Sequence, residues 1–153
     1  MVRLEAKSID PGALLKAFCE GRRDVGAVVS FTGLTRGSTD GAAVSRLGLD
    51  AYPGYTEKVM AELEGETRAR FTVLDVLVAH RWGDLAVGEP IVFVAVAAEH
   101  RRDAFQAADF LMDQLKTRAP FWKKETGPDG DRWIEARDQD HADVARWNSG
   151  DRP

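Results

Sequence analysis

Residues 90–117 read PIVFVAVAAEHRRDAFQAADFLMDQLKT, and this stretch decides the fold of the chain. Its first nine residues are apolar and rich in valine, which predicts a strand over Pro90–Ala98. The rest carries apolar residues at helical spacing, which predicts a helix with one apolar face over residues 101–117. That face consists of Ala104, Ala108, Leu111, Met112 and Leu115. Pro120 ends the helix, because the residue before a proline disfavours helical backbone angles.

Working outward from this stretch, weaker patterns predict further elements of both kinds. We expect helices over residues 11–20 and 56–70, and strands over residues 25–32, 44–51, 71–79, 121–125 and 133–136. Glycine-rich segments at residues 33–41 and 81–89 predict loops and turns, and the last dozen residues are polar enough to fray or to dock elsewhere. The order of elements predicts an α+β fold with a mixed or antiparallel sheet covered by helices.

Composition narrows the class of protein. The chain has 153 residues, the size of one ordinary domain, and its net charge of -4 disfavours a general nucleic-acid binder. The longest apolar stretch is far shorter than the roughly 20 residues that span a bilayer, and no secretory signal is visible. The chain has one cysteine, Cys19, which cannot form an internal disulfide. We therefore expect a reducing, cytoplasmic setting.

The common catalytic signatures are missing from the sequence. It contains no GxSxG elbow, no phosphate-binding GxxxxGK[ST] loop, no GxGxxG and no HExxH. The three histidines, His80, His100 and His141, lack the spacing of metal ligands. We expect no metal site, and nothing in the sequence calls for a cofactor.

Basic residues at element boundaries are the candidate functional groups. His100, Arg101 and Arg102 open the best helix, where free backbone N–H groups favour an anion, although both arginines could equally point into water or pair with Asp103 and other acids. Lys116 and Lys123 flank the Pro120 bend, and a fold that turns back there would bring both ammonium groups to one pocket. Taken alone, Lys116 is an ordinary complement to the helix dipole. From the residues we predict only a possible pocket for an anionic ligand.

Five motifs in register resemble the MoaE family, the large catalytic subunit of molybdopterin synthase. They are GAVVSFTGLTRG at residues 26–37, LDAYPGYTEK at 49–58, HRWGDLAVGE at 80–89, HRRDAFQAADFLMDQLKTRAPFWKKE at 100–125 and DRWIEAR at 131–137. They stand in the family's order, and the resemblance as a whole covers roughly residues 2 to 147. One departure is visible, because many relatives have histidine where this chain has Ala51.

The resemblance implies a fold, an activity and partners. The implied fold is an α/β hammerhead with a small added β-subdomain, in a single catalytic domain over residues 1–147 with a polar tail over residues 148–153. The implied assembly is a homodimer within a heterotetramer, in which each large subunit binds a small ubiquitin-like sulfur carrier. The implied reaction converts cyclic pyranopterin monophosphate (precursor Z) into molybdopterin. Two dithiolene sulfurs come from the thiocarboxylated Gly-Gly C-terminus of the small subunit, so that this sulfurtransferase needs no thiol of its own.

The resemblance also implies the site residues. Lys116 is the main catalytic candidate and Lys123 assists it. The substrate-binding set consists of Leu34, Thr35, Arg36, His100, Arg101, Lys116, Lys123, Lys124 and Glu125, and Arg137 is a further candidate anion contact. His100 and Arg101 are expected to bind the pterin and its phosphate, reaching across the dimer.

Two other functions stay open at this point. The chain could be a module that holds the tail of a carrier protein without catalysis. It could also bind RNA or phosphate through its basic helix ends, although its net acidity argues against this.

Overall fold

A computed structural model describes residues 1–135 and 138–148. Its larger sheet has the strand order β1-β6-β8-β2, in which β1 runs parallel to β6 and the other neighbours are antiparallel. The strands are β1 (Val2–Glu5), β6 (Asp75–Arg81), β8 (Pro90–Ala98) and β2 (Ala27–Leu34). Strand β8 therefore lies inside the sheet, whereas β2 forms one edge.

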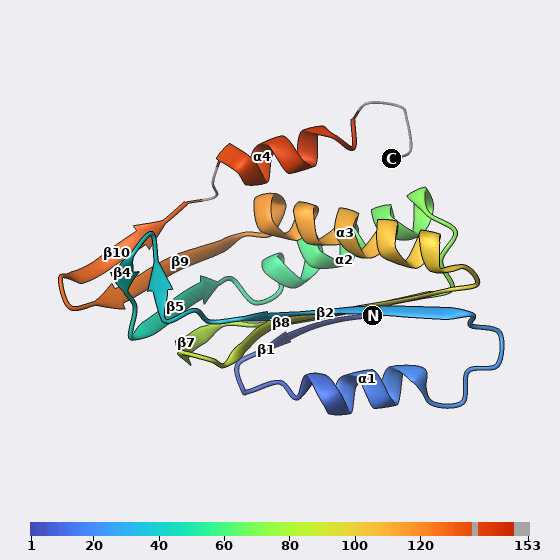
Figure 1. Cartoon of the computed structure of the whole chain (residues 1–153), viewed down its shortest axis with the longest axis horizontal. Coiled ribbons are helices and arrows are strands. Elements are labelled where there is room, and N and C mark those ends of the chain that lie inside the picture. The colour runs from blue at the N-terminus through green and yellow to red at the C-terminus, as the bar shows by residue number, and fades with distance from the viewer. Residues whose placement is uncertain (136–137, 149–153) are drawn as a thin grey trace.

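Helices cover both faces of this sheet (Figure 1). Helix α1 (Pro11–Cys19) lies on one face, and α2 (Tyr55–Arg70) and α3 (Arg101–Arg118) lie on the other. The side chain of Asp10 accepts a hydrogen bond from the Ala13 N–H and caps α1. Alternate residues of β8 enter two cores, because strand side chains point to opposite faces. One core lies under α2 and α3, the other against α1.

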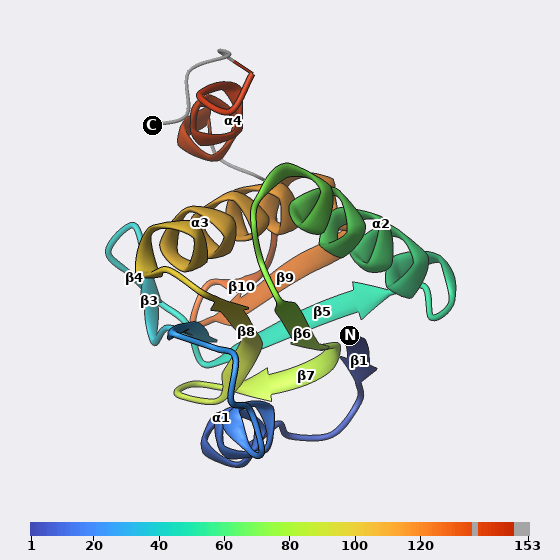
Figure 2. The ribbon, with the colours of Figure 1, turned by 90° about the vertical axis from the view of Figure 1, so that its right-hand side faces the viewer.

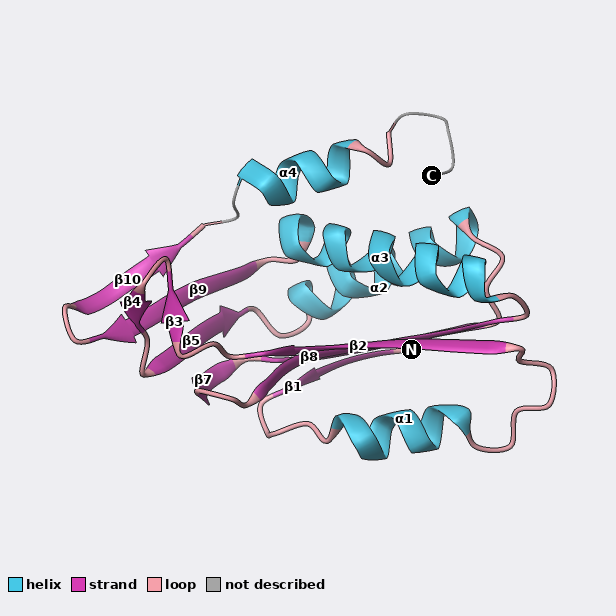
Figure 3. Ribbon diagram, in the orientation of Figure 1, coloured by secondary structure: helices cyan, strands magenta, loops and turns pink. Residues whose placement is uncertain are grey.

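A second, wholly antiparallel sheet extends from the end of the first, with the order β10-β9-β5-β7 (Figures 2 and 3). Its strands are β10 (Gly130–Ile134), β9 (Phe121–Gly127), β5 (Arg46–Ala51) and β7 (Gly83–Ala86). A short hairpin of β3 (Ser38–Thr39) and β4 (Ala42–Ala43) lies beside it. A Cβ atom on Gly127 would lie 2.5 Å from the Ala43 carbonyl oxygen, so only glycine allows this close approach. The α+β class with an added β-unit is as expected.

The last described element is α4 (Asp138–Ala145), which packs on α3. Trp147 follows α4 in the chain, and its buried ring contacts Phe71 and Phe110 edge-on in the core under α2 and α3. The Arg146 guanidinium donates to Asp109 and Asp113 on α3. The polar C-terminal region therefore docks rather than frays as far as residue 148. Within the described ranges, no helix combines the length and apolar character needed to cross a bilayer.

Several expected boundaries differ from the structure. The strand expected from Phe71 begins at Asp75, because the Phe71 N–H closes the last turn of α2 and its ring is buried. The strand expected over residues 133–136 begins at Gly130, and residue 136 lies outside the described residues. Strand β1, the β3–β4 hairpin and β7 occupy segments for which no strand was expected.

Candidate functional site

Two groups of candidate basic residues lie at opposite ends of α3. His100 is the N-cap of this helix and Lys116 lies in its last turn. At a rise of 1.5 Å per residue, Arg101 and Lys116 are separated by roughly 22 Å along the axis. Figure 1 shows α3 running along the molecule, with its C-terminal end beside β9. Within one chain, the helix therefore keeps these cations apart.

Lys116 projects from the C-terminal end of α3 towards α4. Its Nζ lies 2.9 Å from Asp140 Oδ1, and the Asp140 side chain is only 15% exposed while that of Lys116 is 57% exposed. A carboxylate thus occupies the position at which an anionic ligand of Lys116 would bind. The geometry suits electrostatic contact with an anion.

Lys123 and Lys124 are adjacent in β9 and therefore point to opposite faces of the second sheet. Lys123 lies opposite the buried Leu49 and shares its inward face, and it is half-buried. Lys124 lies on the outward face, where its Nζ is 3.1 Å from Asp131 Oδ2 and 5.8 Å from the Trp133 ring centre. Hydrogen bonds from Thr126 and then Lys124 lower the pKa of Asp131. Of the two lysines, only Lys123 faces the inside of the molecule.

Glu125 is buried, and both of its carboxylate oxygens have partners. Thr39 Oγ1 donates to one oxygen at 2.8 Å, and Arg132 donates to the other at 3.2 Å. These contacts tie the β3–β4 hairpin and β10 to β9. The carboxylate therefore holds the framework around the lysines.

The segment that carries Arg36 is fixed at its base by the turn that joins β7 and β8. The Thr35 N–H donates to the Glu89 carbonyl at 2.9 Å, and the Gly88 N–H donates to the Thr35 carbonyl at 2.8 Å. Thr35 is buried, whereas the side chains of Leu34 and Arg36 are exposed. A rigid base with an exposed arginine at its tip suits anion binding.

Arg81 and Glu89, for which no role was expected, support this base. The buried Arg81 guanidinium donates to Glu89 Oε2 at 3.0 Å, and the Ala86 N–H donates to the same oxygen at 2.8 Å. The backbone hydrogen bond and then the guanidinium lower the pKa of the Glu89 carboxyl. Both residues belong to the HRWGDLAVGE motif, which was the available signal.

His80, from the same motif, is a structural residue. Its ring stacks on Phe121 with centres 3.9 Å apart, and Nδ1 donates to the Arg81 carbonyl at 2.8 Å. Loss of solvent lowers the pKa of His80 to about 4, and the hydrogen bond to Arg81 only partly offsets this effect. The neutral imidazole therefore supports the start of β9.

A large groove lies at the other end of α3. A cavity of about 1280 Å³ is bordered by β2, the first turns of α3 and the segment after α4. His100 and Arg101 line it together with Phe31, Phe105 and Trp147. Lys116 and Lys123 do not border this cavity. Among the described residues, no three potential metal-binding side chains gather in one place, and Arg137 lies outside the described residues.

Comparisons with known proteins identify proteins that are similar to this chain in sequence and in fold. The family model described as "MoaE protein" matches residues 4–118. The chain is 50% identical to the molybdopterin synthase catalytic subunit of Caulobacter vibrioides over 97% of both chains. It resembles the solved molybdopterin biosynthesis MoaE protein of Burkholderia ambifaria with a TM-score of 0.82 and 41% identity over 97% of both chains. A more distant likeness, with a TM-score of 0.71, 21% identity and 90% and 91% coverage of the two chains, is to a complex of subunits 1 and 2 of molybdopterin-converting factor from Helicobacter pylori.

Proposed function

The chain belongs to the MoaE protein family, and on that basis we propose how its charged residues serve a sulfur-transfer reaction. Its function is that of the catalytic subunit of molybdopterin synthase, an enzyme of molybdenum cofactor biosynthesis. The observation that carries this function is the match along nearly the whole length of curated catalytic subunits. The enzyme works with a small partner subunit, as its relatives' designation as one subunit of the synthase implies.

We propose that the substrate is cyclic pyranopterin monophosphate and that the partner is a ubiquitin-like carrier with a thiocarboxylated Gly-Gly C-terminus. The position of the chain's one thiol supports an external sulfur source. Cys19 ends α1, which lies on the opposite face of the larger sheet from α3 and Lys116. The reaction takes place in the cytoplasm, where a carrier thiocarboxylate and a free cysteine both persist.

Lys116 is the main catalytic group of this proposal. Attack of a thiocarboxylate on the substrate develops negative charge, which an adjacent ammonium stabilises and can neutralise by giving a proton. Lys116 lies in the last turn of α3, and its Nζ is 2.9 Å from a carboxylate oxygen of Asp140, so the position beside the ammonium already holds an anionic group. Substrate binding at this point displaces Asp140.

Lys123 and Arg36 complete the anion-binding surface in the proposal. Lys123 lies on the inward face of β9, opposite Leu49. Strand β9 begins three residues after α3 ends, so the bend at Pro120 connects the strand of Lys123 directly to the helix of Lys116. Arg36 is presented on the rigid segment that also includes Leu34 and Thr35. The charged groups of Lys124 and Glu125 already have partners in Asp131 and Thr39, respectively. In the proposal, Lys124 therefore acts from the outward face of β9, and Glu125 holds the framework around the lysines.

A second copy of the chain supplies His100 and Arg101. The roughly 22 Å between Arg101 and Lys116 exceeds the reach of two side chains to one small substrate. We propose that residues 1–147 form one catalytic domain and that two such domains pair in a homodimer. The contact of Trp147 with the main core supports an extent to residue 147.

The decisive experiment compares Lys116→Ala with Lys58→Ala. Lys58 is an exposed lysine on α2 with only a distant ion pair to Glu62, which makes it a matched control. Each variant is mixed with thiocarboxylated small subunit and cyclic pyranopterin monophosphate, and the oxidised, fluorescent pterin product is measured. Losing one group that stabilises transition-state charge lowers the rate by about 10²–10³, so Lys116→Ala should fall that far while Lys58→Ala keeps full turnover. Full turnover by Lys116→Ala would remove this lysine from the mechanism, and bound partner without product from wild type would indicate a non-catalytic module.

A further inference from the structure

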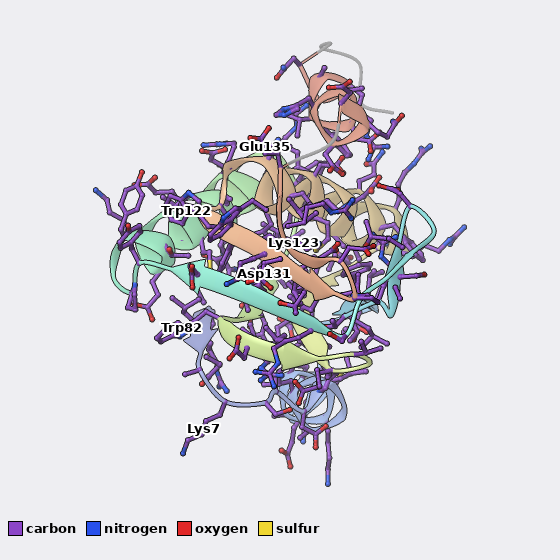
Figure 4. All side chains as sticks on the ribbon, turned by 90° about the vertical axis from the view of Figure 1, so that its left-hand side faces the viewer. Lys7, Trp82, Trp122, Lys123, Asp131 and Glu135 are labelled. Atoms are coloured by element: carbon purple, nitrogen blue, oxygen red, sulfur yellow. The ribbon has the colours of Figure 1, made fainter. Side chains whose placement is uncertain are left out.

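The outward face of the second sheet carries a cluster of exposed aromatic rings. Tyr52 is 62% exposed, Trp122 46% and Trp133 59%. Figure 4 looks onto this end of the molecule, with Trp122 and Asp131 labelled near the β9–β10 hairpin. No described helix packs on this face, since α1, α2 and α3 all cover the larger sheet. Exposed aromatic clusters of this kind commonly mark interaction surfaces.

The strand register places these rings around one carboxylate. Asp50 lies directly opposite Trp122, and Trp133 lies opposite Lys124, two residues further along β9 on the same face. The Tyr52 ring stands perpendicular to that of Trp122, with centres 5.1 Å apart and planes at 89°. Asp50, Ala51 and the three rings line an open cavity of about 360 Å³, which we term the aromatic cup.

The charge of the aromatic cup favours a cation. Within residues 1–135 and 138–148, the Asp50 carboxylate forms no ion pair, whereas Asp84 and Asp131 on the same face pair with Arg46 and Lys124. Ring faces and a carboxylate both attract positive charge. The Lys124 ammonium, 5.8 Å from the Trp133 centre, already makes such a contact at the rim. A phosphate or a carboxylate would be repelled by Asp50.

We propose that the aromatic cup binds a lysine or arginine side chain of the small partner subunit and so anchors that subunit beside β9. This inference rests on the proposed function, which requires a carrier tail near Lys123. Lys123 and Trp122 are neighbours on opposite faces of β9, so a carrier whose tail reaches Lys123 has its body close to this part of the second sheet. An exposed lysine or arginine of the carrier can insert between the rings. There the rings and the Asp50 carboxylate replace the water molecules that surround the cation in solution.

Isothermal titration of the small subunit into the full-length chain tests this inference. Asp50→Asn removes the charge and keeps the shape, Trp133→Leu removes one ring, and Asp84→Asn removes a paired carboxylate on the same face as a matched control. We expect Asp50→Asn and Trp133→Leu each to weaken binding by about ten-fold, the scale of a cation–π contact with a carboxylate. Asp84→Asn should bind as wild type does. The affinity of Asp50→Asn should also depend less on salt, because one charge pair is gone.

Each other outcome overturns the inference. Unchanged affinity in both variants means that the partner docks elsewhere. A loss in Trp133→Leu alone means that an apolar side chain fills the cup, and a loss in Asp50→Asn alone means that the rings take no part. Thermal unfolding of each variant guards against a folding defect, which is small for side chains this exposed. Wild-type turnover with the same partner, measured separately, tests the proposed function itself, so the two failures remain distinct.

Discussion

At the scale of single residues, the buried His80 makes the stability of the folded chain depend on pH. Its pKa of about 4 lies below the value of 6.5 for an exposed imidazole, so the unfolded state binds more protons between these two pH values. Stability therefore falls as the pH drops from about 6.5 to about 4, by up to about 3 kcal/mol, and this contribution changes no further below pH 4. Urea unfolding of wild type and His80→Phe across this range should show the pH dependence shrinking in the variant, which keeps an aromatic ring against Phe121.

Asp75 provides an internal control for that experiment. Partial burial opposes its ionisation, but hydrogen bonds from Arg22 and Arg68 outweigh this and lower the pKa of Asp75 to about 2. Its folded-state pKa is depressed, so its contribution is present above the unfolded value of about 3.8 and is lost as the pH falls towards 2. The His80 and Asp75 windows are thus separate. A wild-type profile that stays flat between pH 6.5 and 4 would contradict the role assigned to His80.

Residue roles were partly predictable from the sequence. Once a strand is assigned to residues 121–125, alternation alone separates Lys123 from Lys124. The burial of Glu125 was not predictable, because its partner Thr39 lies in a segment that had been expected to be a loop and its partner Arg132 lies just before an expected strand. Likewise, the support that Arg81 gives to the Arg36 segment passes through Glu89 and backbone atoms of Thr35 and Gly88, contacts that no spacing rule encodes.

At the scale of elements, α4 is held to the body of the molecule largely by Trp147, which lies two positions beyond its last residue. The helix has no buried residue of its own, whereas Trp147 is 2% exposed and donates from Nε1 to Asp113 at 2.7 Å. Trp147→Ala removes that anchor at a cost of about 3–5 kcal/mol if the gap does not close. We expect amide hydrogen exchange to show α4 losing its protection while β8 keeps it. Trp133→Ala, at an exposed ring, should leave α4 protected; equal loss in both variants would contradict the anchoring role.

The contact between α4 and Lys116 predicts a change in substrate affinity. Asp140→Asn removes the carboxylate that competes with an anionic substrate for the Lys116 ammonium. An exposed ion pair contributes at most about 1 kcal/mol, so the KM for cyclic pyranopterin monophosphate should fall by roughly two- to five-fold. Asp143→Asn, on the same helix but bonded to Gln139, is the matched control and should leave KM unchanged. A raised KM in Asp140→Asn would show that this carboxylate helps to hold the site rather than block it.

Elements with a strong apolar period were predictable, and those held by contacts distant in sequence were not. Strand β8 and helix α3 agree closely with their patterns because each buries a continuous apolar surface. The β3–β4 hairpin was missed although Asp40-Gly41, both with positive φ, is a strong hairpin signal. Strand β1 is four residues long and exists through its pairing with β6, and α4 has no apolar face to predict it.

At the scale of the whole molecule, the length of α3 determines what one chain can do alone. The helix spans the larger sheet from the groove at His100 to the second sheet at Lys116 (Figure 1). This separation was predictable from the sequence, since a continuous helix cannot bring its two ends together. The position of the groove was not predictable, because β2, α3 and Trp147 meet there only in the folded chain. The proposed site is therefore complete only when two chains combine.

Mixing two defective variants tests this shared site directly. Lys116→Ala and Arg101→Ala homodimers each lack one essential group in both sites, so each alone should be nearly inactive. In a hybrid dimer, one site combines the intact Lys116 of one chain with the intact Arg101 of the other, and the second site carries both defects. Random exchange of subunits should therefore restore about a quarter of wild-type turnover, because half of the dimers are hybrids with one intact site each. Lys116→Ala mixed with Lys123→Ala is the matched control. In the proposal both lysines come from the same chain, one in the last turn of α3 and one in β9, so no hybrid contains an intact site and activity should stay low. Restoration in the control, or none in the test mixture despite confirmed exchange, would mean that the site is not divided between two copies in this way.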